Sequence, residues 1–283
     1  MIEVIRVFPA RTNWTPDDAL AFIGEPGLFR PPDRRMPVRV SAVFSWLKGY
    51  AEGLAGAWAT FYDDVRVGGP AFGDPGDEFT PGLFLKKGCT ITSRGCPKKC
   101  GWCIVPTLSG PIRELSIQPG WIVQDDNLLA CSERHIRAVF EMLQAQNRLI
   151  FFNGGLDKHF LRDWHAGLFA SIPVGELWFA CDVLGDLPAL ERATKILQGL
   201  QLDERHLRCY TMIGYDGESL ADAERRVERV FELGFGPFTQ LYQPPETKVY
   251  SLPWRELRRK WSRPAAYMGR KERQNGEIKT GMD

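Results

Sequence analysis

Short apolar runs alternate with amphipathic segments from residue 88 to residue 242, and this alternation constrains the fold more than any other feature. Six runs have the length and composition of strands: 89–93, 120–124, 149–153, 177–181, 207–213 and 238–242. Helical spacing of apolar residues lies between them, at 132–146, 161–170, 188–200 and 219–233. Strands that alternate with helices form parallel sheets covered by helices. The sequence therefore predicts an α/β fold with parallel strands.

A shorter unit of the same kind precedes this region. A strand at 38–44, a helix at 45–62 and a strand at 64–67 form a βαβ pattern, which favours parallel strands and a right-handed crossover. Glycine and proline are frequent from 71 to 82, which indicates a loop or linker. We expect three parts: an N-terminal α/β cap at 1–85, a core at 86–250 and a C-terminal tail at 251–283.

Three of the seven cysteines lie within eight residues, directly after the first strand of the core: Cys96, Cys100 and Cys103. In parallel α/β folds, ligands bind at the carboxyl ends of the strands. Three thiolates this close can bind one soft metal centre, and Lys98 and Lys99 favour the thiolate form. Three ligands are one short of a closed four-ligand site, so a [4Fe–4S] cluster bound here would keep one iron open.

A structural zinc site is the alternative for this loop. It would take His135 or Cys89 as its fourth ligand. Zinc loops usually contain paired C-x2-C elements, and the sequence has no second pair. The odd number of cysteines also argues against a disulfide framework. No apolar run approaches the roughly 18 residues that span a bilayer, and no signal sequence is visible. We therefore expect a cytoplasmic protein without membrane contact.

The spacing C-x3-C-x2-C, with Trp102 before the third cysteine, resembles the signature of the radical S-adenosylmethionine (SAM) superfamily. The lead-in at 92–95 and Pro106 are also similar, and the region 88–242 resembles the partial (βα)6 barrel of that family. The resemblance implies a [4Fe–4S] cluster on Cys96, Cys100 and Cys103, with SAM on the open iron. It also implies an external one-electron reductant, a 5′-deoxyadenosyl radical that takes hydrogen from a substrate, and a position near the adenine for Trp102.

The resemblance implies further SAM contacts at the strand ends. Asp125, Asp126 and Asn127 stand where the family binds the SAM amino group, although the same residues are good helix caps. Asn153 follows the third strand and either reaches SAM or forms a turn. Asp182 resembles the residue that contacts the ribose, with aspartate in place of the commoner glutamate. The adenine-packing segment is represented by Arg208, Ile213 and Gly214; simple barrel core is the alternative for these positions and for Asp182.

Two residues on predicted strands are candidate catalytic groups, Cys181 and Tyr210. A thiol that faces the barrel could donate a hydrogen atom to a product radical. The alternative for Cys181 and Cys209 is a role as small buried hydrophobic residues. Cys89 and Cys131 have no partner spacing, so we expect no auxiliary cluster. The segment 65–71 resembles the end of a cobalamin-binding domain, but the cobalt-ligating Asp-x-His-x-x-Gly motif is absent. We therefore expect a remnant domain without cobalamin.

The tail from 254 to 283 carries nine basic and four acidic residues, net +5, in a chain of net charge +1. Basic and aromatic residues together suit phosphate contact and base stacking. The alternative is a helix that docks on the barrel, because Trp254, Leu257 and Trp261 have helical spacing. The whole chain resembles small radical SAM proteins of phage-type genomes, some of which act on hypermodified thymine in DNA; a phage gene would place it in the host cytoplasm.

These observations predict a radical SAM enzyme that rearranges or modifies a nucleic-acid base in DNA or a modified nucleotide, as an isomerase or by another radical reaction. One alternative is a peptide or small-molecule substrate in the same barrel. The other is a zinc-stabilised nucleic-acid-binding module without catalysis.

Overall fold

The computed structural model describes residues 3–74, 76, 78–244, 248–262, 264 and 267. The chain forms two compact units. The first unit comprises Met1–Lys99, Ile104–Asp126 and Glu133–Gln146, and the second comprises Cys100–Cys103, Asn127–Ser132 and Asn147–Asp283. Among the described residues, no helix has the length and apolar character needed to cross a membrane.

The first unit begins with a four-stranded parallel sheet in the order β2-β1-β3-β4. Its strands are β1 (Ile5–Phe8), β2 (Ala21–Ile23), β3 (Val38–Ser41) and β4 (Val65–Gly68). The helix α1 (Lys48–Ala59) connects β3 to β4 and buries Leu54 and Trp58 in the core of this sheet. The predicted βαβ pattern is present as β3, α1 and β4, whereas β1 and β2 add to it.

The rest of the first unit contains short strands. β5 (Cys89–Thr90) pairs with β8 (Ile122–Val123) in parallel, and β6 (Ser93–Arg94) pairs with β7 (Arg113–Glu114) in antiparallel orientation. The helices are α2 (Val105–Leu108) and α3 (Glu133–Gln144). β5 and β8 are shorter than the predicted strands 89–93 and 120–124. After β5, the amide of Thr92 donates to the side chain of Asp125.

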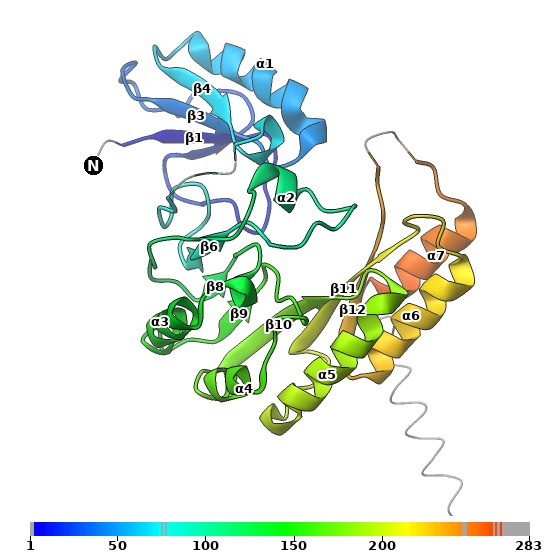
Figure 1. The fold of residues 1–283 in the computed structure, drawn as a ribbon. Helices are drawn as coiled ribbons and strands as arrows, with labels where there is room; N and C mark the ends of the chain where they lie inside the picture. Colours follow the sequence, from blue (N-terminus) through cyan, green and yellow to red (C-terminus); the bar gives the residue numbers. More distant parts are fainter. Residues whose placement is uncertain are drawn as a thin grey trace, which may run out of the picture. The chain divides into compact units, whose positions relative to one another are not determined.

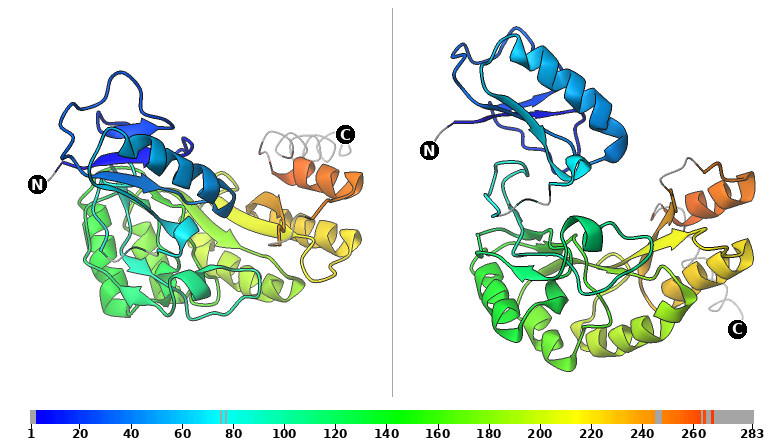
Figure 2. Two further views of the ribbon diagram at one scale, coloured as in Figure 1. Left: turned by 90° about the horizontal axis from the view of Figure 1, so that it is seen from above. Right: turned by 45° about the horizontal axis from the view of Figure 1, so that its top comes forward.

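The second unit repeats a strand and a helix three times and closes with a strand (Figures 1 and 2). β9 (Ile150–Phe152), β10 (Val174–Ala180), β11 (Leu207–Ile213) and β12 (Gly236–Leu241) pair in parallel in this order. The helices α4 (Asp163–Ala170), α5 (Leu187–Leu197) and α6 (Leu220–Glu232) separate them in the chain. This arrangement confirms the predicted α/β fold with parallel strands.

The helix α7 (Leu252–Trp261) packs against β12 and α6 within the second unit. Leu257, Trp261 and Tyr267 are buried in one core cluster with residues of β11 and α6. The helical alternative for the tail is therefore present, and the rings of Trp261 and Tyr267 are covered by protein rather than available for base stacking. Arg255, Arg258 and Arg259 are exposed on α7. Lys260 is partly buried and pairs with Glu224 and Glu228 of α6. The other basic residues of the tail, from Arg263 onward, lie outside the described residues.

Candidate cluster and cofactor site

Two adjacent carboxylates hold the segment that leads into the cysteine loop. Asp125 is 1% exposed and accepts three hydrogen bonds, from Thr92 N (2.7 Å), Thr92 Oγ1 (2.6 Å) and Ser93 Oγ (2.7 Å). Asp126 accepts from Gly95 N at 2.7 Å. Burial raises the pKa of Asp125. Both side chains therefore position the backbone directly before Cys96, a role that the sequence alone did not indicate.

These contacts bear on the predicted SAM contacts. An ionised carboxylate has about four acceptor positions, and Thr92 and Ser93 occupy at least three of those of Asp125. Asn127 is buried and precedes a 3-10 helix (Leu128–Ala130), and its side chain makes no capping hydrogen bond there. Contact of these three residues with SAM stays a prediction.

The second half of the cysteine loop packs against the end of β11, within the second unit. Trp102 meets the ring of Tyr215 edge-on, with centroids 5.0 Å apart. The Tyr215 hydroxyl lies so close to Gly101 that a Cβ atom there would overlap it. Tyr215 in turn meets the ring of Tyr242 at 4.9 Å. Sequence reasoning missed Tyr215, because 113 residues separate it from Trp102.

The three cysteines differ in exposure: Cys96 and Cys100 are partly exposed, and Cys103 is exposed. Cys96 belongs to the first unit and the other two to the second. Within the described part of the chain, no three histidine, cysteine, aspartate or glutamate side chains are placed as a metal site. The donor chemistry nevertheless fits a [4Fe–4S] cluster, since three accessible thiols follow one another in one loop.

The two residues considered as a fourth zinc ligand, Cys89 and His135, lie in environments that do not favour zinc binding. Cys89 is fully buried in β5, and burial raises the pKa of its thiol to about 11, which disfavours the thiolate that binds metal. His135 is 7% exposed, and its Nδ1 lies 3.8 Å from Glu114 Oε2. Neither environment favours the zinc alternative.

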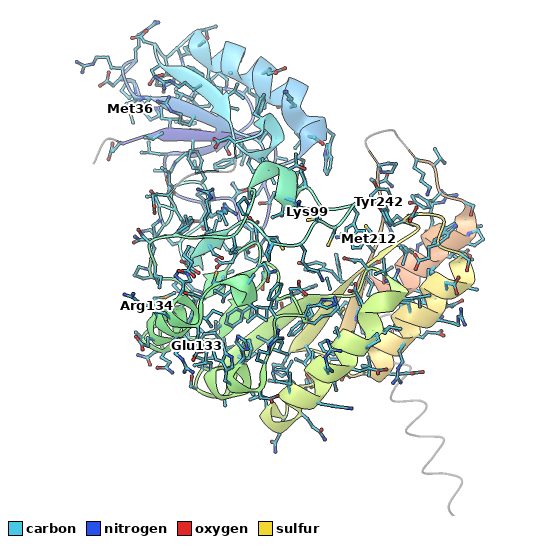
Figure 3. All side chains as sticks on the ribbon, viewed as in Figure 1. Met36, Lys99, Glu133, Arg134, Met212 and Tyr242 are labelled. Atoms are coloured by element: carbon cyan, nitrogen blue, oxygen red, sulfur yellow. The ribbon has the colours of Figure 1, made fainter. Side chains whose placement is uncertain are left out.

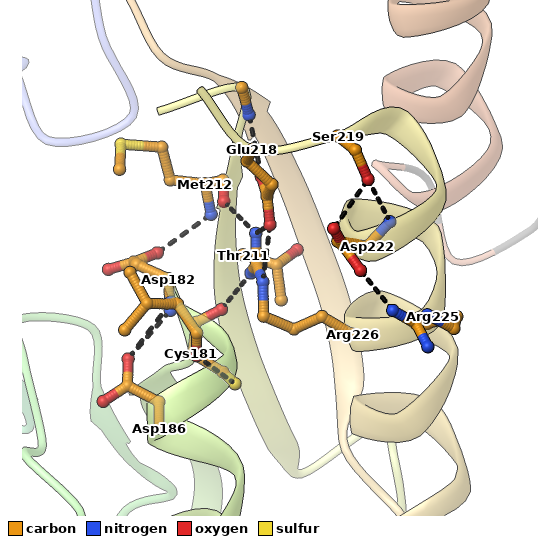
Figure 4. Close-up of polar contacts among 12 residues, drawn as sticks. Cys181, Asp182, Asp186, Thr211, Met212, Glu218, Ser219, Asp222, Arg225 and Arg226 are labelled. Atoms are coloured by element: carbon orange, nitrogen blue, oxygen red, sulfur yellow. Dashed lines mark hydrogen bonds and ion pairs between the residues drawn. The ribbon is translucent and has the colours of Figure 1, made fainter. Parts of the chain in front are cut away.

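A network of polar contacts ties the carboxyl end of β10 to that of β11 (Figure 4). Asp182 accepts from Met212 N at 2.9 Å. The fully buried guanidinium of Arg226 donates to the carbonyls of Cys181 and Met212 and to Glu218. Burial raises the pKa of Asp182. The strand ends are therefore fixed independently of any ligand, with Asp182 between them.

The two candidate catalytic residues lie on opposite faces of this sheet. Ala180 pairs with Tyr210, so Cys181, one residue further on, points to the other face. Cys181 is fully buried, on the same face as Leu177 and Phe179, and burial raises the pKa of its thiol to about 12. The structure thus does not bring the Cys181 thiol and Tyr210 together. Its burial favours the core role for Cys181, and the catalytic roles stay predictions.

The remaining predicted contacts lie at opposite ends of β11: Ile213 and Gly214 at its carboxyl end, and Arg208 near its amino end. Ile213 is buried against α6, and the Arg208 guanidinium lies 5.0 Å from the ring of Trp178. Gly214 has a positive φ of 80°, and a Cβ there would meet the Tyr250 ring at 2.7 Å. The absence of a side chain at Gly214 thus allows the Tyr250 ring to lie close to the backbone. Met212 and Tyr242 mark the carboxyl ends of β11 and β12 in Figure 3.

Asn153 differs from these residues because it has an unused acceptor. It directly follows β9, and its Oδ1 is buried without a hydrogen-bond partner among the described residues. A buried polar atom without a partner is costly. A polar ligand at the carboxyl edge would remove this cost, so the residue fits the predicted cofactor.

The first unit also contains a cavity of about 930 Å³ at the carboxyl ends of β1, β3 and β4. In the four-stranded sheet, the chain continues from β1 to β2 on one side and from β3 to β4 on the other, so the direction of winding changes between β1 and β3. Open α/β sheets bind ligands at such a point. The lining combines apolar residues, three arginines and several aromatic rings, among them Phe8, Trp14, Phe44, Phe79 and Phe84.

No protein-family model matches this chain, and no curated protein matches it. The structure is similar to that of TsrM from Kitasatospora setae, a radical SAM methyltransferase solved with cobalamin and a [4Fe–4S] cluster bound. The TM-score is 0.60 at 12% identity, over 84% of this chain and 74% of that one. At this identity the likeness shows the fold: α/β with parallel strands.

Proposed function

We propose that this protein is a radical SAM enzyme. The observation that carries the proposal is the three-cysteine loop after β5, in a fold shared with a radical SAM methyltransferase. Cys96, Cys100 and Cys103 would hold three irons of a [4Fe–4S] cluster and leave the fourth open to SAM. When bound, such a cluster supplies the electron that cleaves a carbon–sulfur bond of SAM.

The chain's own residues would bind and orient SAM. The unpartnered Oδ1 of Asn153 would accept a hydrogen bond from it, and Asp182, fixed by Met212 N, would accept from the ribose. Asp126 is already used by Gly95 N, yet a carboxylate has room for a second donor such as the amino group. Arg226 would keep the strand ends in place during the reaction.

The proposed substrate is a nucleic-acid base, such as a modified thymine in DNA. Support comes from the exposed arginines on α7, which would contact phosphates. Charge reversal of Arg258 and Arg259 should lower DNA affinity and flatten its salt dependence, as measured by fluorescence anisotropy. Deletion of the tail is a poor test, because it removes the buried residues Leu257, Trp261 and Tyr267. An unchanged salt slope would favour a peptide or small-molecule substrate.

The cavity of the first unit favours a second candidate, methyl transfer with a bound corrinoid. Its volume of about 930 Å³ is at the upper end for small-molecule sites, and the described residues that line it include no histidine. The missing Asp-x-His-x-x-Gly motif therefore argues only against cobalt ligation by histidine. Cobalamin added to the protein would show a perturbed absorption spectrum after gel filtration if this candidate is correct.

The first experiment is anaerobic reconstitution with iron and sulfide, followed by reduction with SAM. Mass spectrometry for 5′-deoxyadenosine, with Cys100→Ala as control, reports the reaction. Nucleoside formed by the wild type alone would support the proposal. Stoichiometric zinc in a colourless protein that binds no cluster would overturn it in favour of the binding module.

A further inference from the structure

We propose that Tyr215 is a positioning residue that holds the turn between Cys100 and Cys103. The inference rests on the proposed function for what these thiols bind. The contact itself stands on the geometry of the second unit, which contains all four residues of the turn and Tyr215.

The contact is made against a glycine. Gly101 follows Cys100 directly, and a Cβ built on it would overlap the Tyr215 hydroxyl while lying 3.6 Å from Cζ of the same ring. The φ of Gly101 is not in the left-handed region, so its backbone conformation is open to alanine. Of these two atoms only the hydroxyl oxygen comes closer than ordinary contact, so the Tyr215 side chain would have to shift to admit a Cβ at this position. Tyr215 covers the turn on this side.

The next residue of the turn packs on the same ring. Trp102 meets Tyr215 edge-on, with centroids 5.0 Å apart and an interplanar angle of 70°. The turn is closed by a hydrogen bond from Cys103 N to Cys100 O (3.1 Å). Tyr215 thus contacts both residues, Gly101 and Trp102, that separate Cys100 from Cys103.

Tyr215 is itself held from the sheet. Its carbonyl accepts from Glu218 N, and its ring meets Tyr242 at 4.9 Å. The preceding Gly214 donates to Glu218 Oε2, and Glu218 is paired with the fully buried Arg226. The ring therefore projects from a fixed strand end. Through Tyr215, the end of β11 holds the backbone of the turn that carries Cys100 and Cys103, two of the three thiols.

We expect substitution of Tyr215 to change the cysteine loop, although Tyr215 itself need not contact a reacting group. A displaced turn would alter the spacing of the Cys100 and Cys103 thiols and the orientation of Trp102. Iron would be lost faster, and the spectrum of the reduced cluster would change, as would its response to SAM. A residue with only a general structural role would lower stability without these changes.

The test is a cycle of variants at the two contacting positions. Gly101→Ala should place its methyl group against the hydroxyl and increase the rate of iron loss to a chelator about tenfold, the scale of an overpacked contact. Tyr215→Phe removes the hydroxyl and should retain iron within about twofold of wild type. In the double variant the methyl group would lie in ordinary contact with the ring, so iron retention should return. Tyr215→Ala should lose iron like Gly101→Ala.

A glycine with open surroundings provides the matched control. No atom lies within 4 Å of a Cβ built on Gly167, in α4, so Gly167→Ala should behave as wild type. Electron paramagnetic resonance of the reduced cluster, with and without SAM, should differ from wild type in Gly101→Ala and return in the double variant. A double variant as defective as Gly101→Ala, or wild-type behaviour of Tyr215→Ala, would overturn the proposal.

A second measurement separates this proposal from the proposed function. In the cluster-free full-length chain, the iodoacetamide labelling rate of Cys100 and Cys103, followed by peptide mass spectrometry, reports the position of the turn. It should change in Gly101→Ala and return in the double variant even if the wild type never binds iron. Such a result would contradict the radical SAM assignment and still support the role of Tyr215; unchanged labelling in Gly101→Ala would count against that role.

Discussion

Replacing Asp125 with alanine should destabilise the first unit by about 3–5 kcal/mol. The carboxylate accepts three hydrogen bonds from Thr92 and Ser93 and is 1% exposed. A buried donor that loses its acceptor costs about 1–3 kcal/mol. The two hydroxyl groups can rotate towards other acceptors, but the Thr92 amide cannot. Three unsatisfied donors would together cost about 3–9 kcal/mol, and we expect the lower half of this range.

Asparagine at the same position provides the isosteric control. Its Oδ1 can accept from Thr92 N, and its amide can donate to the two hydroxyl groups, which then act as acceptors. We expect Asp125→Asn to cost less than about 1.5 kcal/mol, within the range of a single neutral hydrogen bond. Alanine and asparagine both remove the charge, so the difference between them isolates the hydrogen bonds.

The pH dependence has a definite sign. Burial raises the pKa of Asp125, so the folded chain binds its proton more tightly than the unfolded chain. The contribution of this group to stability is then largest below its unfolded pKa of about 4 and falls as the pH rises through the folded pKa. Asp125→Asn has no such dependence. The stability of the wild type relative to Asp125→Asn should therefore decrease from about pH 4 upward.

Hydrogen exchange of a peptide that contains Thr92 is the suitable assay, because it reports on this unit even if the two units unfold separately. Urea unfolding followed by circular dichroism gives the accompanying free energy. Equal losses in Asp125→Ala and Asp125→Asn would refute the hydrogen-bond argument. Wild-type exchange in Asp125→Ala would show that the carboxylate does not hold the segment.

Two further predictions concern buried groups of the second unit. Arg226→Met should cost about 3–5 kcal/mol in urea unfolding, because it leaves the Glu218 carboxylate, 13% exposed, without its cation. Arg226→Met with Glu218→Gln should cost less than Arg226→Met alone; equal costs would contradict the pairing. Cys181 should resist iodoacetamide in the folded chain at mildly alkaline pH while Cys103 reacts, since Cys181 is buried with a pKa of about 12 and Cys103 is exposed; labelling of Cys181 without denaturant would contradict its burial.

The alternation of strands and helices was predictable because the period of apolar residues is a local property of the chain. The strands β1 and β2 were not predicted, and for β1 there is a physical reason. Arg6 lies in the centre of β1 and is 6% exposed, which interrupts the apolar pattern. Its charge is satisfied by Asp18 and by the carbonyls of Gly82 and Leu83, and the latter contacts span 76 and 77 residues. Partners that distant leave no local signal.

The same distinction applies to the site. The cysteine motif is contained in eight residues, so the sequence alone reveals it. The hydrogen bonds of Asp125 span 32 and 33 residues, and the contact of Tyr215 with Gly101 spans 114. At Gly214, sequence reasoning expected a ligand to use the space, and the structure places Tyr250 there. A family pattern indicates where space is needed, but tertiary packing determines what fills it.

The cysteine loop is held on both sides by contacts that need no metal. Asp125 and Asp126 bind the backbone before Cys96 in the first unit, and Tyr215 packs on the turn after Cys100 in the second. A zinc-stabilised module depends on its metal for folding and unfolds when a chelator removes it. A loop held by carboxylates and an aromatic ring should instead keep its structure, and retained hydrogen-exchange protection of residues 88–96 after chelation would separate the two. These contacts therefore favour an accessible cluster site over a structural zinc site.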